Sequence, residues 1–167
     1  RFKLKTWLGD HTRFGMNGTF DDPMDDPIFE RAEFKDIRVV RELKDRAYRQ
    51  IGSSGSGNHF VEFGVVEILS DQNEWNVPAG RYVAVLSHSG SRGLGANIAN
   101  HYTKVAMNTT LLPKEAKHLA WLGLDTEAGQ EYWLAMNLAG DYASACHHHI
   151  HRRLGRALGA EPLAMVE

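Results

Sequence analysis

The stretch Gln50–Glu62 constrains the fold more than any other part of this chain, because a loop of Gly and Ser runs directly into a strand-like segment. Positions 52–57 read Gly-Ser-Ser-Gly-Ser-Gly, and Asn58 and His59 follow them. Apolar residues then recur from Phe60 to Leu69, which predicts a strand. Because Gly permits backbone conformations closed to other residues, the sequence predicts a metal-capable imidazole presented at the edge of a rigid sheet.

A second segment repeats this arrangement. The apolar run Tyr82–Leu86 predicts a strand from Arg81 to Leu86, and this strand passes into Ser87–Gly93, which contains His88 and Arg92. The link between the two predicted strands is short and polar and ends in a Pro-Ala-Gly turn, so we expect the strands to be adjacent. The predicted fold class is therefore α+β, with a mixed or antiparallel sheet whose strand ends carry His59 and His88, packed against long helices.

Helical periodicity predicts most of the packing partners of this sheet. One helix is expected from Asp36, as its N-cap, to Arg49, and another from Leu94 to Met107. Pro113 is expected to open a short helix through Leu119. A long, Ala-rich helix is expected after Asp125-Thr126. The helix that begins at the second Gly-rich turn would place its first amides beside His88, where they could bind an anion.

The first part of the chain has little periodicity. Residues 1–26 predict a loop, with at most a short strand near Phe2–Trp7. Asp21-Asp22-Pro23 and Asp25-Asp26-Pro27 are typical of turns or helix starts. Their spacing fits no calcium loop, so we do not expect a metal there.

Length and composition predict one globular domain over residues 1–167. The chain begins at Arg1 without Met and ends just after an apolar run, so we expect it to be a fragment of a longer protein. A formal net charge of −2 argues against a basic surface over the whole chain. The single cysteine, Cys146, excludes an intramolecular disulfide framework and a Cys-based zinc motif. No run is apolar enough to span a membrane and no signal-peptide pattern is present, so we expect a cytoplasmic protein.

The chemistry-bearing residues cluster around the two Gly/Ser segments. Neutral imidazoles suit Mn, Fe, Co, Ni or Zn, and Mn tolerates mixed shells that include phosphate oxygen. Arg92 offers a bidentate fork for phosphate, and the hydroxyls beside it can donate hydrogen bonds. The candidate metal ligands are His59 and His88; the candidate phosphate- or RNA-binding residues are Arg46, Ser89, Ser91 and Arg92; and Asn58 adds an amide that could contact a base, a phosphate or a metal-bound water.

Two other features invite comparison with known sites. Gly52–Gly57 lacks the Gly-Lys-Thr of a P-loop and leads into a strand rather than a helix. His147 and His151 share a helix face at a spacing that can bind zinc, but the Glu of an H-E-x-x-H site is missing. We therefore expect the run His147–His151 to form a solvated or partly buried helix face.

Three blocks in the same order resemble the RtcB-type RNA-splicing ligases. Gln50–Glu62 resembles the Gly-rich Asn-His-Phe block of that family, and His88–Gly93 resembles its His-(Ser/Thr)-Gly-Ser-Arg-Gly block. Glu127–Tyr132, followed by Ala135-Met-Asn and Tyr142-Ala, is similar to its helical block.

The resemblance implies a GTP- and Mn²⁺-dependent RNA ligase. Such enzymes join RNA ends bearing a 3′-phosphate or 2′,3′-cyclic phosphate to a 5′-hydroxyl, by way of a guanylylated histidine. Their RNA partners are tRNA halves or broken RNA. On this chain the resemblance places metal ligands at His59 and His88, a guanylate contact at Asn58 and a phosphate contact at Arg92.

The chain also departs from the family. The upstream Asp-(Ile/Val)-Gly-Cys block has no counterpart in residues 1–49, and Ala145-Cys146-His147 stands where the family usually has Ala-Asn-Arg. The resemblance also implies that residues 1–167 are the central part of a longer RtcB-like catalytic domain, with a further metal histidine and the guanylylated histidine downstream of residue 167. We therefore expect no catalytic nucleophile in this chain, an inactive isolated chain and a divergent member. The alternatives are a non-catalytic metal- or phosphate-binding module and a metal-dependent phosphoesterase.

Overall fold

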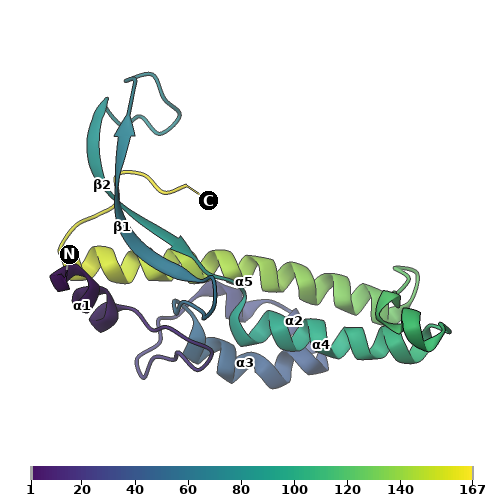
Figure 1. Cartoon of the computed structure of the whole chain (residues 1–167). Coiled ribbons are helices and arrows are strands. Elements are labelled where there is room, and N and C mark those ends of the chain that lie inside the picture. Colours follow the sequence, from purple (N-terminus) through teal and green to yellow (C-terminus); the bar gives the residue numbers. More distant parts are fainter. Residues whose placement is uncertain (1, 167) are drawn as a thin grey trace.

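The computed structural model describes residues 2–166, and side chains from Leu4 onward. Helices pack along one another beneath a hairpin that projects away from them (Figure 1). The predicted α+β class is confirmed. The elements in chain order are α1 (Phe2–His11), the 3-10 helix η1 (Pro27–Glu30), α2 (Glu33–Asp36), α3 (Arg38–Gln50), β1 (Phe60–Ile68), β2 (Gly80–His88), α4 (Arg92–Thr109), the 3-10 helix η2 (Lys114–Leu119) and α5 (Glu127–Leu158).

The N-terminal segment Phe2–His11 is a helix, so the prediction of a loop there, with at most a short strand near Phe2–Trp7, is wrong. Trp7 lies against Phe63 of β1, with ring centroids 5.7 Å apart, and against His11 one turn along its own helix. Trp7 and Leu8 pack on a small cluster that includes Val61 and residues of α5. Contacts with residues distant in the sequence therefore stabilise α1, and the weak periodicity of residues 2–11 does not reveal those contacts.

The core is formed mainly by α3, α4 and α5. Val40, Leu138 and Tyr142 are fully buried, and the Tyr142 hydroxyl donates a 2.7 Å hydrogen bond to the Ala47 carbonyl on α3. The predicted helix at 36–49 is confirmed with one change. Asp36 ends α2 instead of capping α3, and Ile37 occupies the N-cap position without a side-chain hydrogen bond.

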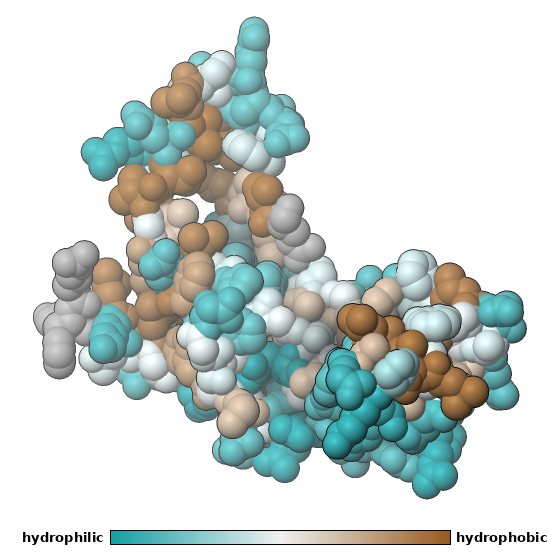
Figure 2. Space-filling view, turned by 45° about the vertical axis from the view of Figure 1, so that its right-hand side comes forward, coloured by the Kyte–Doolittle hydropathy of each residue, from teal (hydrophilic) through white to brown (hydrophobic). Residues whose placement is uncertain are grey.

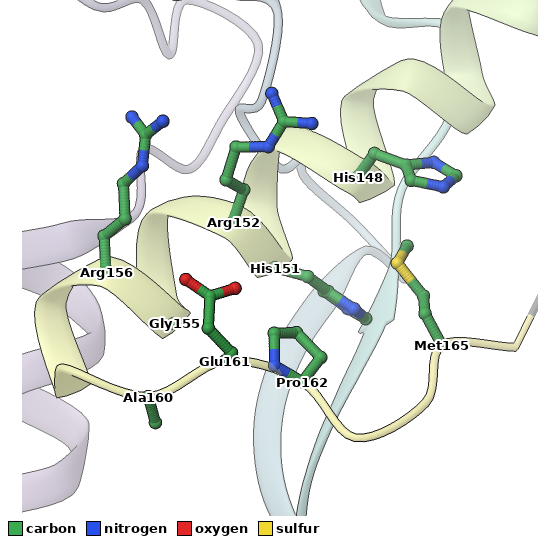
Figure 3. A pocket seen from close by; sticks show the side chains of 9 residues that line it. All are labelled: His148, His151, Arg152, Gly155, Arg156, Ala160, Glu161, Pro162 and Met165. Atoms are coloured by element: carbon green, nitrogen blue, oxygen red, sulfur yellow. The ribbon is translucent and has the colours of Figure 1, made fainter. Parts of the chain in front are cut away.

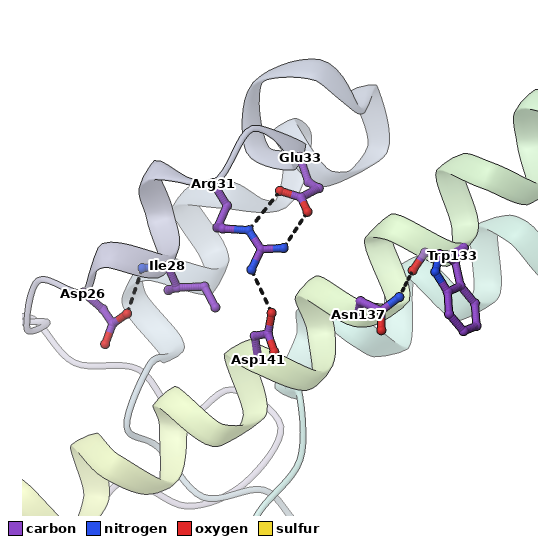
Figure 4. Close-up of polar contacts among 7 residues, drawn as sticks. All are labelled: Asp26, Ile28, Arg31, Glu33, Trp133, Asn137 and Asp141. Atoms are coloured by element: carbon purple, nitrogen blue, oxygen red, sulfur yellow. Dashed lines mark hydrogen bonds and ion pairs between the residues drawn. The ribbon is translucent and has the colours of Figure 1, made fainter.

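A salt-bridge cluster ties α2 to α5 (Figure 4). The Arg31 guanidinium contacts a Glu33 carboxylate oxygen at 2.7 Å and an Asp141 oxygen at 2.8 Å. The hydrogen bond from Arg31 lowers the pKa of the nearly buried Glu33 carboxyl, and this effect exceeds that of its burial. Asp26 caps η1 by accepting a 2.8 Å hydrogen bond from the Ile28 amide, which confirms the helix-start prediction at Asp25-Asp26-Pro27.

The hairpin is an antiparallel pair in which Phe60 faces His88 at one end and Ile68 faces Gly80 at the other. Its base rests on α5, where Val61 packs with Ile150 and Leu154. Further out, apolar side chains face solvent within the described part of the chain, and Figure 2 shows apolar surface on the projecting arm. The predicted adjacency of the two strands is confirmed.

The long helix α5 supports the rest of the molecule. The Thr126 hydroxyl caps its start by accepting a hydrogen bond from the Gly129 amide, and Gly159 ends it in the left-handed conformation with φ 64°. The predictions of this helix and of the helix after the second Gly-rich turn are confirmed, and the segment after Pro113 adopts a 3-10 helix. No helix among residues 2–166 has the length and apolar character needed to cross a membrane.

Candidate functional site

The two candidate metal ligands lie together at the end of the hairpin that meets the helices. His59 directly precedes β1, and His88 is the last residue of β2. Since Phe60 pairs with His88, the register places the two histidines side by side, with ring centroids 5.5 Å apart. The structure therefore brings together the two imidazoles that the sequence singled out.

His59 is partly buried and chemically unusual. Its Nδ1 is buried and has no hydrogen-bond partner within the described residues. Burial lowers the pKa of its imidazole, and the nearby guanidinium of Arg92 lowers it further, followed by the neighbouring side chains of His88 and His147. A neutral ring with an unpartnered nitrogen is the form that binds a metal ion, so the residue fits the proposed ligand chemistry.

The Gly/Ser loop closes tightly over this histidine. The Gly55 carbonyl accepts a 2.9 Å hydrogen bond from the Gly15 amide, which holds the loop in place. A Cβ atom on Gly55 would overlap the His59 imidazole and would lie 2.6 Å from Nη1 of Arg92. Only glycine fits between these two side chains, so the loop composition follows directly from the geometry of the site.

Arg92 lies on the other side of Gly55. Its Nε donates to the Ser53 hydroxyl at 3.0 Å and its Nη2 donates to the Gly15 carbonyl at 2.6 Å. It pairs with no carboxylate in the described part of the chain, and burial lowers its pKa. Its backbone has φ 53°, a strained value for a residue other than glycine and one that often marks a functional site. An uncompensated, half-buried guanidinium is suited to binding an anion.

The remaining candidates differ in what their side chains do. The Ser89 hydroxyl is buried and donates a 3.3 Å hydrogen bond to the Ser53 carbonyl, so it stabilises the Gly/Ser loop. Ser91 occupies the N-cap position of α4, but its side chain makes no capping hydrogen bond. Arg46 lies close to the start of α4, since a Cβ added to Gly93 would lie 2.8 Å from its Nε. Asn58 is exposed on the loop.

The anion site expected at the start of α4 is partly filled by the protein. The side-chain carbonyl of Gln50 accepts a 3.1 Å hydrogen bond from the Gly93 amide. Gln50 is buried and also donates to the Met16 carbonyl. This amide is therefore satisfied internally, and Arg92 is left as the main group for an anion.

Sequence reasoning missed the role of the histidines on α5. His147 Nε2 lies 3.1 Å from the Ser89 amide and 2.9 Å from its carbonyl oxygen, and His151 Nε2 lies 2.9 Å from the Ser87 hydroxyl. The two histidines thus hold the residues on either side of His88. Their i, i+4 spacing was visible in the sequence, but their partners on β2 were not.

The expectation that His147–His151 forms a solvated or partly buried face is wrong for His149. Its ring is 98% buried, since only 2% of the side chain is exposed, and its Nε2 lies 2.8 Å from an Asp26 carboxylate oxygen. A Cβ on Gly52 would lie 2.8 Å from the His149 Cβ, so this histidine also supports the beginning of the Gly/Ser loop.

No described group of three or more His, Cys, Asp or Glu side chains is arranged to hold a metal ion. His59 and His88 therefore offer two neighbouring nitrogens and leave the other coordination positions to other ligands.

Comparison with known proteins places these residues in a family. A family model for tRNA-splicing ligase RtcB matches residues 3–163. The chain is similar to RNA-splicing ligase RtcB homolog 1 of Entamoeba dispar, with 32% identity over 110 residues, 64% of this chain and 21% of the relative. It is 35% identical over 113 residues to tRNA-splicing ligase RtcB of Pyrococcus furiosus, covering 64% of this chain and 12% of the relative.

A longer match reaches tRNA-splicing ligase RtcB of Nanoarchaeum equitans, with 30% identity over 142 residues, 83% of this chain and 28% of the relative. The chain thus spans between 12% and 28% of the length of these relatives. Because the family model covers nearly all of the chain, the resemblance read from the three sequence blocks is confirmed, and the chain belongs to the RtcB family of tRNA-splicing ligases.

Proposed function

We propose that this chain forms part of the catalytic site of an RNA ligase that uses Mn²⁺ and GTP. The reaction would join an RNA 3′-phosphate or 2′,3′-cyclic phosphate end to a 5′-hydroxyl end. The observation that carries the proposal is the convergence of His59, His88 and the unpaired Arg92 at one end of the hairpin. The chain that carries these residues belongs to the RtcB family of tRNA-splicing ligases, which supports the same activity.

His59 and His88 would hold the Mn²⁺ ion. Their neutral nitrogens suit this metal, and the unpartnered Nδ1 of His59 supports a role as ligand. Bound Mn²⁺ would neutralise phosphate charge and help to orient in-line attack. His147 and His151 keep the backbone around His88 in place through Ser89 and Ser87.

Arg92 would bind the phosphate group. Its guanidinium is held by Ser53 and Gly15, so it loses little further freedom when a phosphate arrives. Arg46 and Ser91 would add contacts at the rim, while the hydroxyl of Ser89 stays with the loop. Asn58, exposed beside His59, would contact the guanylate.

The test is the Mn²⁺-dependent transfer of labelled GMP from GTP, followed by RNA joining, in the protein at its full natural length. Replacing His88 by Ala should lower both activities by more than about 100-fold. Loss of a residue that hydrogen-bonds a metal ligand lowers metal affinity or activity by about 10- to 100-fold, and loss of the ligand itself should have a larger effect. His118→Ala is the matched control, since His118 is an exposed histidine on η2. Unchanged joining by His88→Ala would refute the ligand assignment.

Two alternative activities give different results in the same assay. Release of phosphate from RNA ends without joining would indicate a metal-dependent phosphoesterase. RNA or metal binding without turnover would indicate a non-catalytic module. The isolated chain of 167 residues should take up no GMP, and stable labelling of it would contradict our assignment of the nucleophile to another part of the protein.

A further inference from the structure

The last turns of α5 carry a row of basic side chains. His148, Arg152 and Arg156 follow one another at four-residue intervals, and Figure 3 shows all three around the same hollow. At a rise of 1.5 Å per residue, the row extends for about 12 Å along the helix. We call His148, Arg152 and Arg156 the basic row.

A groove of about 300 Å³ lies between this part of α5 and the segment that follows it. The chain turns back after Gly159, where the Ala160 amide donates a 3.0 Å hydrogen bond to the Gly155 carbonyl. A Cβ on Gly155 would lie 2.9 Å from the Ala160 carbonyl oxygen. Glycine at position 155 therefore allows the close approach that shapes the groove.

The groove carries an excess of positive charge. Arg152 and Arg156 are exposed, and neither pairs with a carboxylate among residues 2–166. By contrast, the neighbouring Arg153 is used internally, because it contacts Asp22 at 3.5 Å and covers the Phe20 ring at 3.8 Å. Among the described lining residues, Glu161 is the only carboxylate. In a chain with net charge −2, the two guanidinium groups of Arg152 and Arg156 therefore lie together at this groove without a carboxylate partner among residues 2–166.

The groove adjoins the candidate metal site. His151 lines it, and the same ring contacts the Ser87 hydroxyl at 2.9 Å, one residue before His88. The basic row therefore begins beside the strand end that carries the candidate ligand and extends away from it. A strand whose terminal phosphate reached Arg92 could continue along this row.

We propose that the groove binds the sugar-phosphate backbone of a single RNA strand as it leads to the His59 and His88 site. This inference rests on the proposed function. Arg152 and Arg156 would each bind a phosphate through a planar, charge-assisted fork. Glu161 would oppose binding by repulsion and so limit the affinity for any polyanion.

The experiment is the fluorescence anisotropy of a short labelled single-stranded RNA, titrated with the full-length protein at several salt concentrations. Arg152→Gln and Arg156→Gln should each weaken binding about threefold to tenfold at low salt. Together they should reduce the slope of log affinity against log salt by about 1.4, the value for two phosphate contacts on a single strand. Glu161→Gln should tighten binding.

The control is Arg38→Gln, which removes an exposed arginine on α3. It should leave both the affinity and the salt slope unchanged. An unchanged slope in the Arg152→Gln/Arg156→Gln variant, or an equal loss in the control, would overturn the inference. If the double variant keeps its RNA affinity while His88→Ala loses GMP transfer, the proposed function stands and the groove assignment fails. If the double variant loses RNA affinity while the parent protein transfers no GMP, the groove assignment stands and the ligase proposal fails.

Discussion

At the scale of single residues, burial decides what each histidine can do. His59 and His149 are both depressed in pKa by burial, yet they differ in their partners. Nδ1 of His59 is buried under Gly55 and close to Arg92, at the end of the hairpin that carries the candidate site, and it has no partner among the described residues. His149 is enclosed in the core with Asp26. His59 is therefore a candidate site residue, whereas His149 stabilises the fold.

The buried His149 should make folding stability depend on pH. Its Nδ1 is buried and has no hydrogen-bond partner among residues 2–166, so protonation would place an unsatisfied N–H in the core. Burial lowers its pKa below the ordinary 6.5, and this outweighs the opposing effect of Asp26. The unfolded chain therefore binds more protons at mildly acid pH, so stability is fully present above about pH 6.5 and falls as pH drops below it.

Urea unfolding at pH values between 5 and 8 measures this effect, and a single group can contribute at most about 1.4 kcal/mol per pH unit. His149→Gln keeps an amide that can donate to Asp26 but does not titrate, so its stability should fall less steeply with acid. His118→Gln, at an exposed position, should keep the wild-type slope. Equal slopes in all three proteins would contradict the role assigned to His149.

At the scale of elements, α5 and the end of β2 act as a unit. His151 contacts the Ser87 hydroxyl, and His147 contacts the backbone of Ser89, so the residues on both sides of His88 are held by one helix. Because a strand end is normally free to fray, these contacts should order the candidate ligand.

A double-mutant cycle tests this connection. Ser87→Ala and His151→Ala should each destabilise the protein, and the two effects should be less than additive by about 0.5–1.5 kcal/mol, the usual net value of one hydrogen bond. Denaturant unfolding of the two single variants and the double variant gives the coupling. Strict additivity would show that the 2.9 Å contact contributes nothing.

The sequence predicted these elements well where apolar residues follow a clear pattern, and poorly where contacts with distant residues determine the secondary structure. Apolar runs located both strands, and helical spacing located α3, α4 and α5 to within a few residues. The prediction failed at Phe2–Trp7, because α1 is stabilised by the contact of Trp7 with Phe63 of the hairpin rather than by helical periodicity in its own sequence. The neighbouring positions of His59 and His88 followed from strand adjacency. The partners of His147 and His151 could not be predicted, because they depend on how α5 crosses the end of β2.

At the scale of the whole molecule, stability is unevenly distributed. The helices share a continuous buried core, whereas the hairpin packs on them near its base, through Val61 and Val85 in a small separate cluster and through Phe63 on Trp7. Two-stranded hairpins are marginal in water by themselves. Towards its tip, Val65 and Val83 face each other in the register and are 63% and 77% exposed. The helices and the hairpin base should therefore carry nearly all the free energy of unfolding.

Matched valine substitutions in the hairpin distinguish these two regions. Val65→Thr with Val83→Thr should change the free energy of unfolding by less than about 1 kcal/mol, because only a cross-strand pair is altered. It should also reduce concentration-dependent light scattering, since it removes exposed apolar surface. Val61→Thr, only 7% exposed and packed on Ile150, places a hydroxyl in a buried cluster and should cost about 1–3 kcal/mol. Comparable losses from the two changes would mean that the outer hairpin is as strongly stabilised as its base, which the exposure of Val65 and Val83 argues against.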